Sequence, residues 1–358
     1  MSSVELSGRL SVETARLRER MELLTRQATT GRRSDQLGDL APDVPRAMTL
    51  RNGLQRLEAY DGVLTQTEGR TTVMQAAMGR MMDIAREFRS TTVPRLYGRD
   101  PVALTIARSD ARAALVEIGH LLNTRHAGEY LFSGSDIGNP PIPDPGALAT
   151  GQMAQDIAAE VANLGGSGAA AVLAGTRTVA QSNAAGVSPF SAFLQSQAAL
   201  APGDREPRRA APAADGERVP YGSFADRNAV AVSTGETTGS WVRDLMRNLM
   251  SVAALDPAQL SLDPEFPDFV SGLRAGFESA ETALAEDRGA LGQTTARLET
   301  MQTRHRQMVD VLREQLANIE EVDLAASLER LQATKTSLEA SYRALASLSE
   351  LSLSRFLR

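Results

Sequence analysis

Residues 284–319 read LAEDRGALGQTTARLETMQTRHRQMVDVLREQLANI, and a leucine, isoleucine or histidine returns at every seventh position. The members of this repeat are Leu284, Leu291, Leu298, His305, Leu312 and Ile319. A seven-residue repeat sustained over this length places its side chains along one face of a single long helix. The pattern is typical of coiled coils and helical bundles, so we expect this face to pack against another helix.

Shorter heptad repeats lie on both sides of this stretch. They comprise one set near the N-terminus, one set after it and one set at the C-terminal end: Leu10, Leu17 and Leu24; Leu50, Leu57 and Leu64; Leu324, Leu331, Leu338 and Leu345. An isolated helix is marginally stable in water, so each leucine stripe needs a covering surface. From the pattern alone, that surface is either another helix of the same molecule or a neighbouring copy.

Helix-breaking residues separate the predicted helices. Gly31 and Pro42 divide the first from the second, and Pro94 ends the second. Asp100 and Pro101 open a third, as N-cap and first helical residue. The acidic stretch 318–323 predicts a bend before the last helix.

The middle of the chain has a different composition. Residues 134–240 are rich in glycine, alanine and proline, and residues 139–146 carry four prolines. Alternating alanine and valine predict a short strand at 229–232, and residues 241–255 predict an amphipathic helix. The expected fold is therefore mainly α: a long antiparallel helical bundle or coiled coil formed by the N- and C-terminal regions, with a small, irregular, β-containing inserted middle domain.

Composition and charge exclude several classes of protein. The chain has no cysteine and a net charge of −6, without a block of like charge. This argues against nucleic acid as a partner, because phosphate neutralisation needs a basic surface. No apolar run reaches the length of a membrane span, and charged residues interrupt residues 1–20, so we expect neither a membrane segment nor a cleaved secretory signal. Lysine occurs once, at Lys335.

No catalytic or cofactor motif is convincing. Residues 166–171 superficially match a dinucleotide turn, but the stretch before them looks helical and no acidic residue follows at the required distance. His120 and His126 are six residues apart, which does not place two imidazoles on one helical face. We therefore expect no metal, no cofactor and no enzyme activity, and keep a helical enzyme with its site in the middle domain as a third possibility.

Several segments resemble the flagellin family. Residues 17–33 (LRERMELLTRQATTGRR) and 46–60 (RAMTLRNGLQRLEAY) are similar to its N-terminal helices, and 123–134 (NTRHAGEYLFSG) resembles its N…G.YLF.G segment. Residues 288–298 (RGALGQTTARL) look like its C-terminal helical entry, and 319–327 (IEEVDLAAS) like its terminal block. The tyrosine-leucine-phenylalanine segment favours the members that join hook to filament over filament flagellins, as does RSDQLGDLAPDV at 33–44 in place of the flagellin stretch.

The resemblance implies a structural role in the bacterial flagellum. Such proteins are exported unfolded through the flagellar type III apparatus, are secreted to the extracellular flagellum and assemble through their terminal helices. The implied partners are other copies of the chain, an adjacent hook-associated protein, flagellin, and an export chaperone at the C-terminal helix. Filament flagellin, the bulk propeller subunit, is the alternative.

The resemblance also implies three domains. Residues 1–40 with 320–358 would form an inner, channel-lining helical domain, residues 41–135 with 240–319 a helical bundle, and residues 136–239 a variable outer domain. The assembly interface would comprise the terminal leucines: Leu10, Leu17, Leu24, Leu324, Leu331, Leu338 and Leu345. The bundle seam would comprise the remaining heptads: Leu50, Leu57, Leu64, Leu284, Leu291, Leu298, His305, Leu312 and Ile319.

Overall fold

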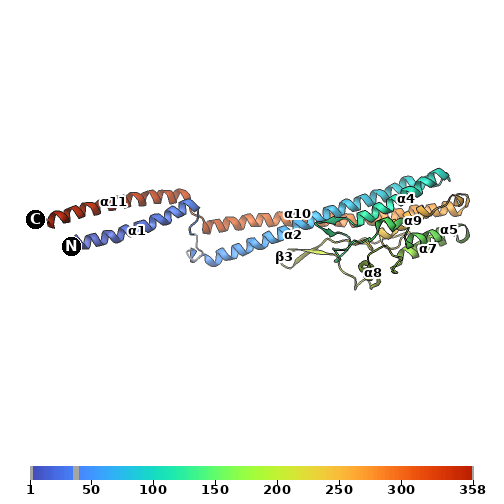
Figure 1. Ribbon diagram of the computed structural model, residues 1–358, viewed down its shortest axis with the longest axis horizontal. Coiled ribbons are helices and arrows are strands. Elements are labelled where there is room, and N and C mark those ends of the chain that lie inside the picture. The colour runs from blue at the N-terminus through green and yellow to red at the C-terminus, as the bar shows by residue number, and fades with distance from the viewer. Residues whose placement is uncertain (1–2, 35–39, 357–358) are drawn as a thin grey trace. The chain divides into compact units, whose positions relative to one another are not determined.

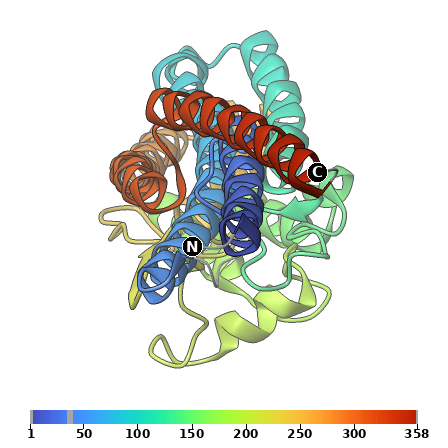
Figure 2. The same ribbon diagram turned by 90° about the vertical axis from the view of Figure 1, so that its left-hand side faces the viewer.

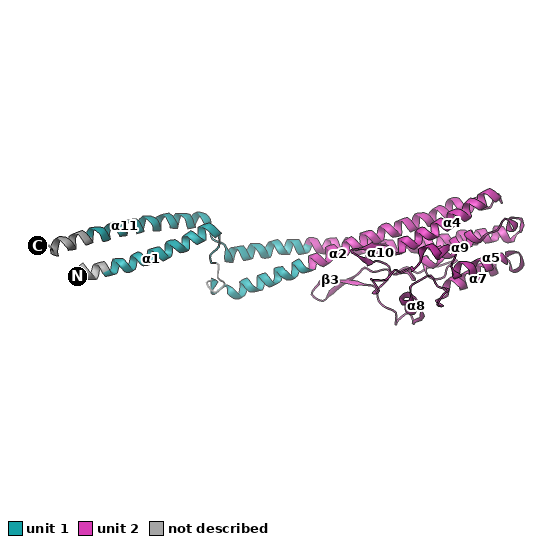
Figure 3. Ribbon diagram, in the orientation of Figure 1, with its two compact units in different colours: residues 1–59, 304–358 teal, residues 60–303 magenta. Residues whose placement is uncertain are grey.

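The structure is a computed structural model that describes residues 3–34 and 40–356. It divides into two compact units (Figure 3): unit 1 comprises residues 1–59 and 304–358, and unit 2 residues 60–303. Long helices from both ends of the chain pair with one another, and a middle region carries two small antiparallel sheets. The predicted fold class is therefore confirmed. The expected terminal domain includes residues 1–2, 35–39 and 357–358, which lie outside the described residues.

Unit 1 is built around the terminal helices α1 (Ser3–Thr30) and α11 (Leu324–Phe356). They pack against each other antiparallel, with the start of α1 and the end of α11 at the same end of the pair (Figures 1 and 2). The unit also contains the first part of α2 (Val44–Glu87) and the last part of α10 (Glu265–Glu320). At the acidic stretch 318–323, where a bend is predicted, α10 stops at Glu320 and α11 begins at Leu324.

Two interruptions meet side by side in unit 1. Gly31 ends α1 with a φ of +71°, a left-handed conformation that glycine adopts without steric cost. Its carbonyl accepts a hydrogen bond from the Val322 amide at 2.9 Å, and Arg33 donates to the Glu320 carbonyl at 2.6 Å. These backbone bonds tie the end of α1 to the turn between α10 and α11.

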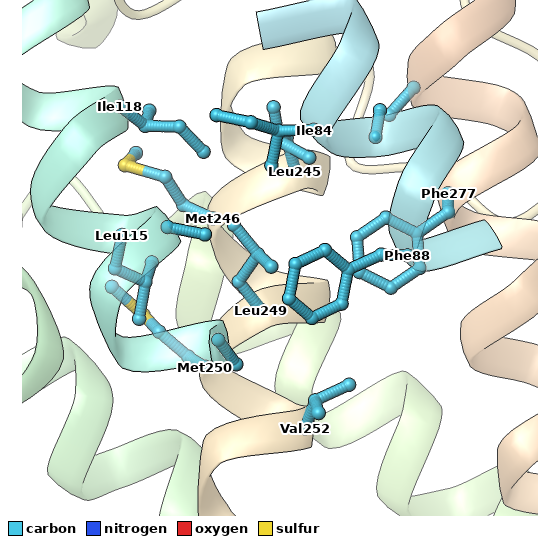
Figure 4. Close-up of a cluster of buried hydrophobic side chains, with 14 of the residues drawn as sticks. Ile84, Phe88, Leu115, Ile118, Leu245, Met246, Leu249, Met250, Val252 and Phe277 are labelled. Carbon is cyan, nitrogen blue, oxygen red and sulfur yellow. The ribbon is translucent and has the colours of Figure 1, made fainter. Parts of the chain in front are cut away.

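Unit 2 has a helical core assembled from distant parts of the chain. After α2 come a π-helical turn (Phe88–Thr92), α3 (Val93–Leu96) and α4 (Pro101–Leu122). The predicted N-cap is confirmed, because the Asp100 side chain accepts from the Val102 amide at 2.9 Å. Figure 4 shows where α2, the π-helical turn and α4 meet α9 (Trp241–Ala254) and α10. The labelled apolar side chains there are Ile84, Phe88, Leu115, Ile118, Leu245, Met246, Leu249, Met250, Val252 and Phe277.

The middle region consists of short helices and two hairpins. It begins with β1 (Arg125–His126) and β2 (Glu129–Tyr130). Five further helical elements follow: a 3-10 turn (Pro145–Ala149), α5 (Gln152–Ala162), α6 (Leu164–Ser167), α7 (Ala169–Gln181) and α8 (Ala192–Ala199). Strands β3 (Ala210–Ala214) and β4 (Glu217–Pro220) pair antiparallel, and a second 3-10 turn (Pro257–Ser261) follows α9.

The predicted strand at 229–232 is wrong. This segment is irregular because its backbone amides bind a carboxylate instead of a neighbouring strand. Asp287 Oδ1 accepts from the amides of Val230 and Ala231, and Oδ2 accepts from Ala229, all at 2.8 Å. Asp287 is 2% exposed, so it fixes this loop from within the protein.

The helix predicted at 241–255 is confirmed as α9, but its polar face does not meet solvent. Arg247 is fully buried and donates to Glu236 at 2.7 Å, and Arg177 donates to the same carboxylate. Asp244 is also buried and accepts from the Thr238 amide. Burial raises the pKa of Asp244, although hydrogen bonds from the loop before α9 oppose the shift. Polar segments of the middle region thus cover the charged side chains of α9 that the amphipathic pattern alone would place at the surface.

A glycine on α10 allows α9 to approach closely. A Cβ at Gly276 would lie 2.6 Å from the side-chain amide of Asn248, which is buried. Gly276→Ala is therefore expected to lower the free energy of unfolding by about 1–3 kcal/mol through overpacking. The matched change Gly289→Ala, on the same helix with nothing within 4 Å, should raise it by about 0.5–1 kcal/mol. Urea unfolding followed by circular dichroism measures both, and shifts of the same sign would contradict this packing.

Candidate assembly surface

The predicted interface leucines differ in exposure along the terminal helix pair. Leu24 and Leu338 are buried where α1 and α11 pack. Four others are half-buried: Leu10, Leu17, Leu331 and Leu345. Leu324 stands at the start of α11 and is 48% exposed. The terminal helices therefore cover part of their leucine stripes within one molecule.

Small polar residues complete the seam between α1 and α11. Thr14, Ser327 and Thr334 are buried, three or four residues from the seam leucines. The Thr14 hydroxyl donates to the Leu10 carbonyl, and the Thr334 hydroxyl donates to the Arg330 carbonyl at 2.7 Å. Because both hydroxyl groups are hydrogen-bonded within their own helix, they can be buried without leaving an unpaired donor. Sequence reasoning missed these residues because it followed leucine alone. The signal was the same seven-residue interval, which separates 327 from 334.

One contact across the pair combines a charge with an aromatic ring. The Arg18 Nε on α1 donates to the Tyr342 hydroxyl on α11. The guanidinium carbon also lies 5.3 Å from the centroid of that ring. Such a cation–π contact adds stability and fixes register, because it forms at a single alignment of the helices. Nothing in the leucine pattern points to this pair.

Several large apolar side chains of unit 1 are exposed. We call this set the outer apolar positions: Val12, Leu23, Met48, Met308, Val311, Leu324 and Leu328, all at least 42% exposed. Val12 and Leu23 are eleven residues apart, close to three helical turns, and therefore share one face of α1. Leu324 and Leu328 are neighbours on α11. Lys335 is exposed on the same helix.

Most side chains of the predicted bundle seam are buried. Six members are buried: Leu50, Leu64, Leu284, Leu291, Leu298 and Ile319. His305 is also buried, at 8% exposed, while Leu57 and Leu312 are half-buried. In unit 1, Glu320 on α10 pairs with Arg51 on α2 at 2.8 Å. In unit 2, Gln75 on α2 donates to Thr295 on α10 at 2.8 Å.

The segment 123–134 connects α4 to the middle region. The Asn123 side chain accepts from the Ile142 amide at 3.0 Å and donates to its carbonyl at 2.7 Å. Phe132 is buried, and its carbonyl accepts from Ala225 at 2.9 Å. Gly134 has a φ of +68°, and a Cβ there would lie 2.9 Å from the Phe224 ring. The asparagine, the aromatic residue and the glycine of this segment therefore each have a structural role in unit 2.

The same segment carries an ion pair with a shifted carboxylate. Glu129 accepts hydrogen bonds from Arg70 on α2 and from Arg209, the latter at 3.3 Å. The hydrogen bond from Arg70 is the main reason that the pKa of Glu129 lies below its usual value. This pair links β2 to α2 within unit 2.

The candidate chemical residues lie apart from one another. His120 is exposed in the last turn of α4, and His126 lies on β1. Among the described residues, no three His, Cys, Asp or Glu side chains are placed to hold a metal ion. Within residues 3–34 and 40–356, no helix is both long and apolar enough to cross a bilayer. Residues 166–171, which superficially match a dinucleotide turn, span α6 and the start of α7.

Taken together, the paired terminal helices and the long α2 and α10 define a helical protein whose two chain ends form one structural element. Residues 275–357 match the family model of the bacterial flagellin C-terminal helical region. No curated protein matches the chain in a sequence search. The family match supports placing the chain in the flagellin family and supports a flagellar structural subunit. The matched segment covers the larger part of α10 and all of α11.

Proposed function

We propose that this protein joins the flagellar hook to the filament, as a hook-associated protein 3 type subunit. The observation that carries the proposal is the packing of α1 against α11. Helix α11 lies within the flagellin-like segment 275–357. The segment 123–134, which resembles the junction members of the family, and the sequence at 33–44 support the junction role over the filament role. The protein would be exported unfolded by the flagellar type III apparatus and would act outside the cell.

Assembly would proceed through the terminal helices. α1 packs chiefly against α11, and this leaves Val12, Leu23, Leu324 and Leu328 exposed on the pair. Fully burying an exposed leucine contributes about 1.5–3 kcal/mol. These four side chains are 42–54% exposed, so covering each contributes about half of that, and a few of them on each copy favour association. Contacts that repeat from copy to copy without closing produce a helical array, as a tubular structure requires.

The proposed organisation keeps the three expected domains. Residues 1–40 with 320–358 would line the channel, residues 41–135 with 240–319 would surround them, and residues 136–239 would face outward. The partners would be further copies of the chain, the adjacent hook-associated protein on one side and flagellin on the other. An export chaperone would bind the apolar face of α11 before assembly, as a groove binds an amphipathic helix.

Deleting the gene is expected to leave hooks that carry no filaments, with flagellin secreted into the medium. The reason is that flagellin would lack the surface on which the filament begins to grow. Electron microscopy of the cells and immunoblotting of the medium measure both effects. Normal filaments in the deletion strain would refute the junction role.

Filament flagellin of the same fold is the second candidate, because the family match alone suits both. Abundance separates them, since a filament contains far more subunits than a single junction. If quantitative blotting of sheared flagella finds this chain as the bulk component, the filament role replaces the junction role.

A further inference from the structure

Two methionines of unit 1 are exposed on its long helices. Met48 lies on α2 and Met308 on α10, and each side chain is 51% exposed. The chain has twelve methionines, and the structure describes all of them except Met1. Of the others, Met21 and Met82 are half-buried, and the remaining seven are at most 7% exposed. Exposure therefore separates Met48 and Met308 from every other described methionine.

Both methionines lie beside the seam between α2 and α10 rather than in it. Ala47, which precedes Met48, is fully buried and packs in one cluster with Ile319. Val309, which follows Met308, is 8% exposed. Successive residues are about 100° apart around a helix axis, so a residue next to a buried one lies on a different face. A chemical change at Met48 or Met308 therefore alters the surface of unit 1 and leaves the packing between the helices in place.

The thioether of an exposed methionine reacts with hydrogen peroxide. The sulfur attacks one peroxide oxygen, an S–O bond forms as the O–O bond breaks, and proton transfer to the leaving oxygen releases water. The sulfur loses two electrons and becomes a sulfoxide, while the peroxide is reduced. The chain has no cysteine, so none of its own thiols competes for the oxidant. A buried methionine reacts only after the surrounding structure opens locally.

Oxidation changes what these positions contribute to an interface. Met48 and Met308 belong to the outer apolar positions, and Val311, three residues after Met308, belongs to the same set. Each subunit of a helical array has several neighbours, which cover exposed side chains of this kind. Covering a thioether is favourable because it removes apolar surface from water. Covering a sulfoxide is costly because its oxygen loses the hydrogen bonds that water supplies.

We propose that Met48 and Met308 are oxidation sites of this protein and that their conversion to sulfoxides weakens the contact between neighbouring copies. The effect on association rests on the proposed assembly, in which a second copy covers unit 1, whereas the oxidation sites do not depend on it. Methionine sulfoxide is reduced back by dedicated reductases, so the change in association is reversible.

Peptide mass spectrometry of the folded full chain treated with hydrogen peroxide tests the two sites. Met48 and Met308 are expected to oxidise at least about tenfold faster than Met74 and Met78, which are buried in unit 2. The chain unfolded in urea is the matched control, since its methionines should all react at similar rates. Equal rates in the folded chain, or faster oxidation of Met74 or Met78, overturns the assignment.

Filament growth tests the effect on association. Purified chain, either untreated or treated with peroxide and then freed of it, is added to hook-bearing cells of the deletion strain. The untreated chain should restore filaments, and the treated chain should restore at least about tenfold fewer. The double variant Met48→Leu with Met308→Leu keeps apolar side chains of similar size without sulfur. It should restore filaments equally well before and after the same treatment.

Two results overturn the proposed effect: unchanged filament growth with the treated natural chain, or an equal loss of growth with the treated double variant. Failure of the junction role gives a different result, because the untreated chain then restores no filaments. The effect on association falls with it, while the oxidation rates of Met48 and Met308 still decide whether they are the reactive sites.

Discussion

The substitution Leu338→Asp is expected to abolish assembly while unit 2 remains folded. Leu338 is 7% exposed on α11, the helix that packs along α1. Removing its buried side chain and placing a carboxylate there costs at least about 3 kcal/mol. Because helices that lose their packing partner are marginal in water, α1 and α11 should separate. Filament growth in the deletion strain complemented with the variant measures assembly, and amide hydrogen exchange of the purified chain measures the state of both units.

Thr336→Asp is the matched control for this experiment. Thr336 lies two residues away on α11 and is exposed, so its replacement should leave assembly unchanged. Leu345→Asp, at a half-buried position of the same stripe, should act as Leu338→Asp does. Normal filament growth with Leu338→Asp would show that the seam between α1 and α11 is not needed for assembly.

The substitution Asp287→Ala is expected to lower the free energy of unfolding of unit 2 by about 3–5 kcal/mol. The carboxylate binds three backbone amides of the loop 229–231 and the Trp241 indole N–H at 2.9 Å. Its removal leaves the buried Trp241 N–H and three part-buried amides without their acceptor, and unpaired buried donors are costly. Urea unfolding followed by Trp241 fluorescence measures the loss.

Glu286→Ala provides the control, because Glu286 precedes Asp287 on α10 but is exposed. It should change the free energy of unfolding by less than about 0.5 kcal/mol, as surface substitutions generally do. If Asp287→Ala has an equally small effect, the carboxylate does not hold the loop.

The long helices were predictable because heptad spacing is a local signal. Leu64, Leu284 and Leu298 lie in a repeat that any helix must place on one face, and the structure buries all three. The N-cap at Asp100 was predictable for the same reason, since its chemistry depends on the next two residues.

The middle region was less predictable because its partners are distant in sequence. The loop 229–232 alternates as a strand does, yet its amides bind Asp287, more than fifty residues away. From the pattern, Arg247 and Asp244 belong to the solvent-exposed face of α9. In the structure they are buried, and they form hydrogen bonds with Glu236 and Thr238. The periodicity of α9 gives no information on where Glu236 and Thr238 lie.

The candidate assembly surface shows the same division. The heptad spacing predicts leucine stripes on the terminal helices. It does not predict how much of each stripe is buried when α1 packs against α11. The pairing of Arg18 with Tyr342 joins residues at opposite ends of the chain. Such a contact follows from the alignment of the two helices, which the sequence pattern leaves open.

Lys335 is the one lysine among the 358 residues, and it lies exposed on α11. A lysine-specific protease can therefore hydrolyse a single peptide bond in this chain. Proteases require an extended backbone, so cleavage there depends on local opening of the helix. The rate of that one cut reports how often α11 unwinds, and it does so without any label or engineered residue.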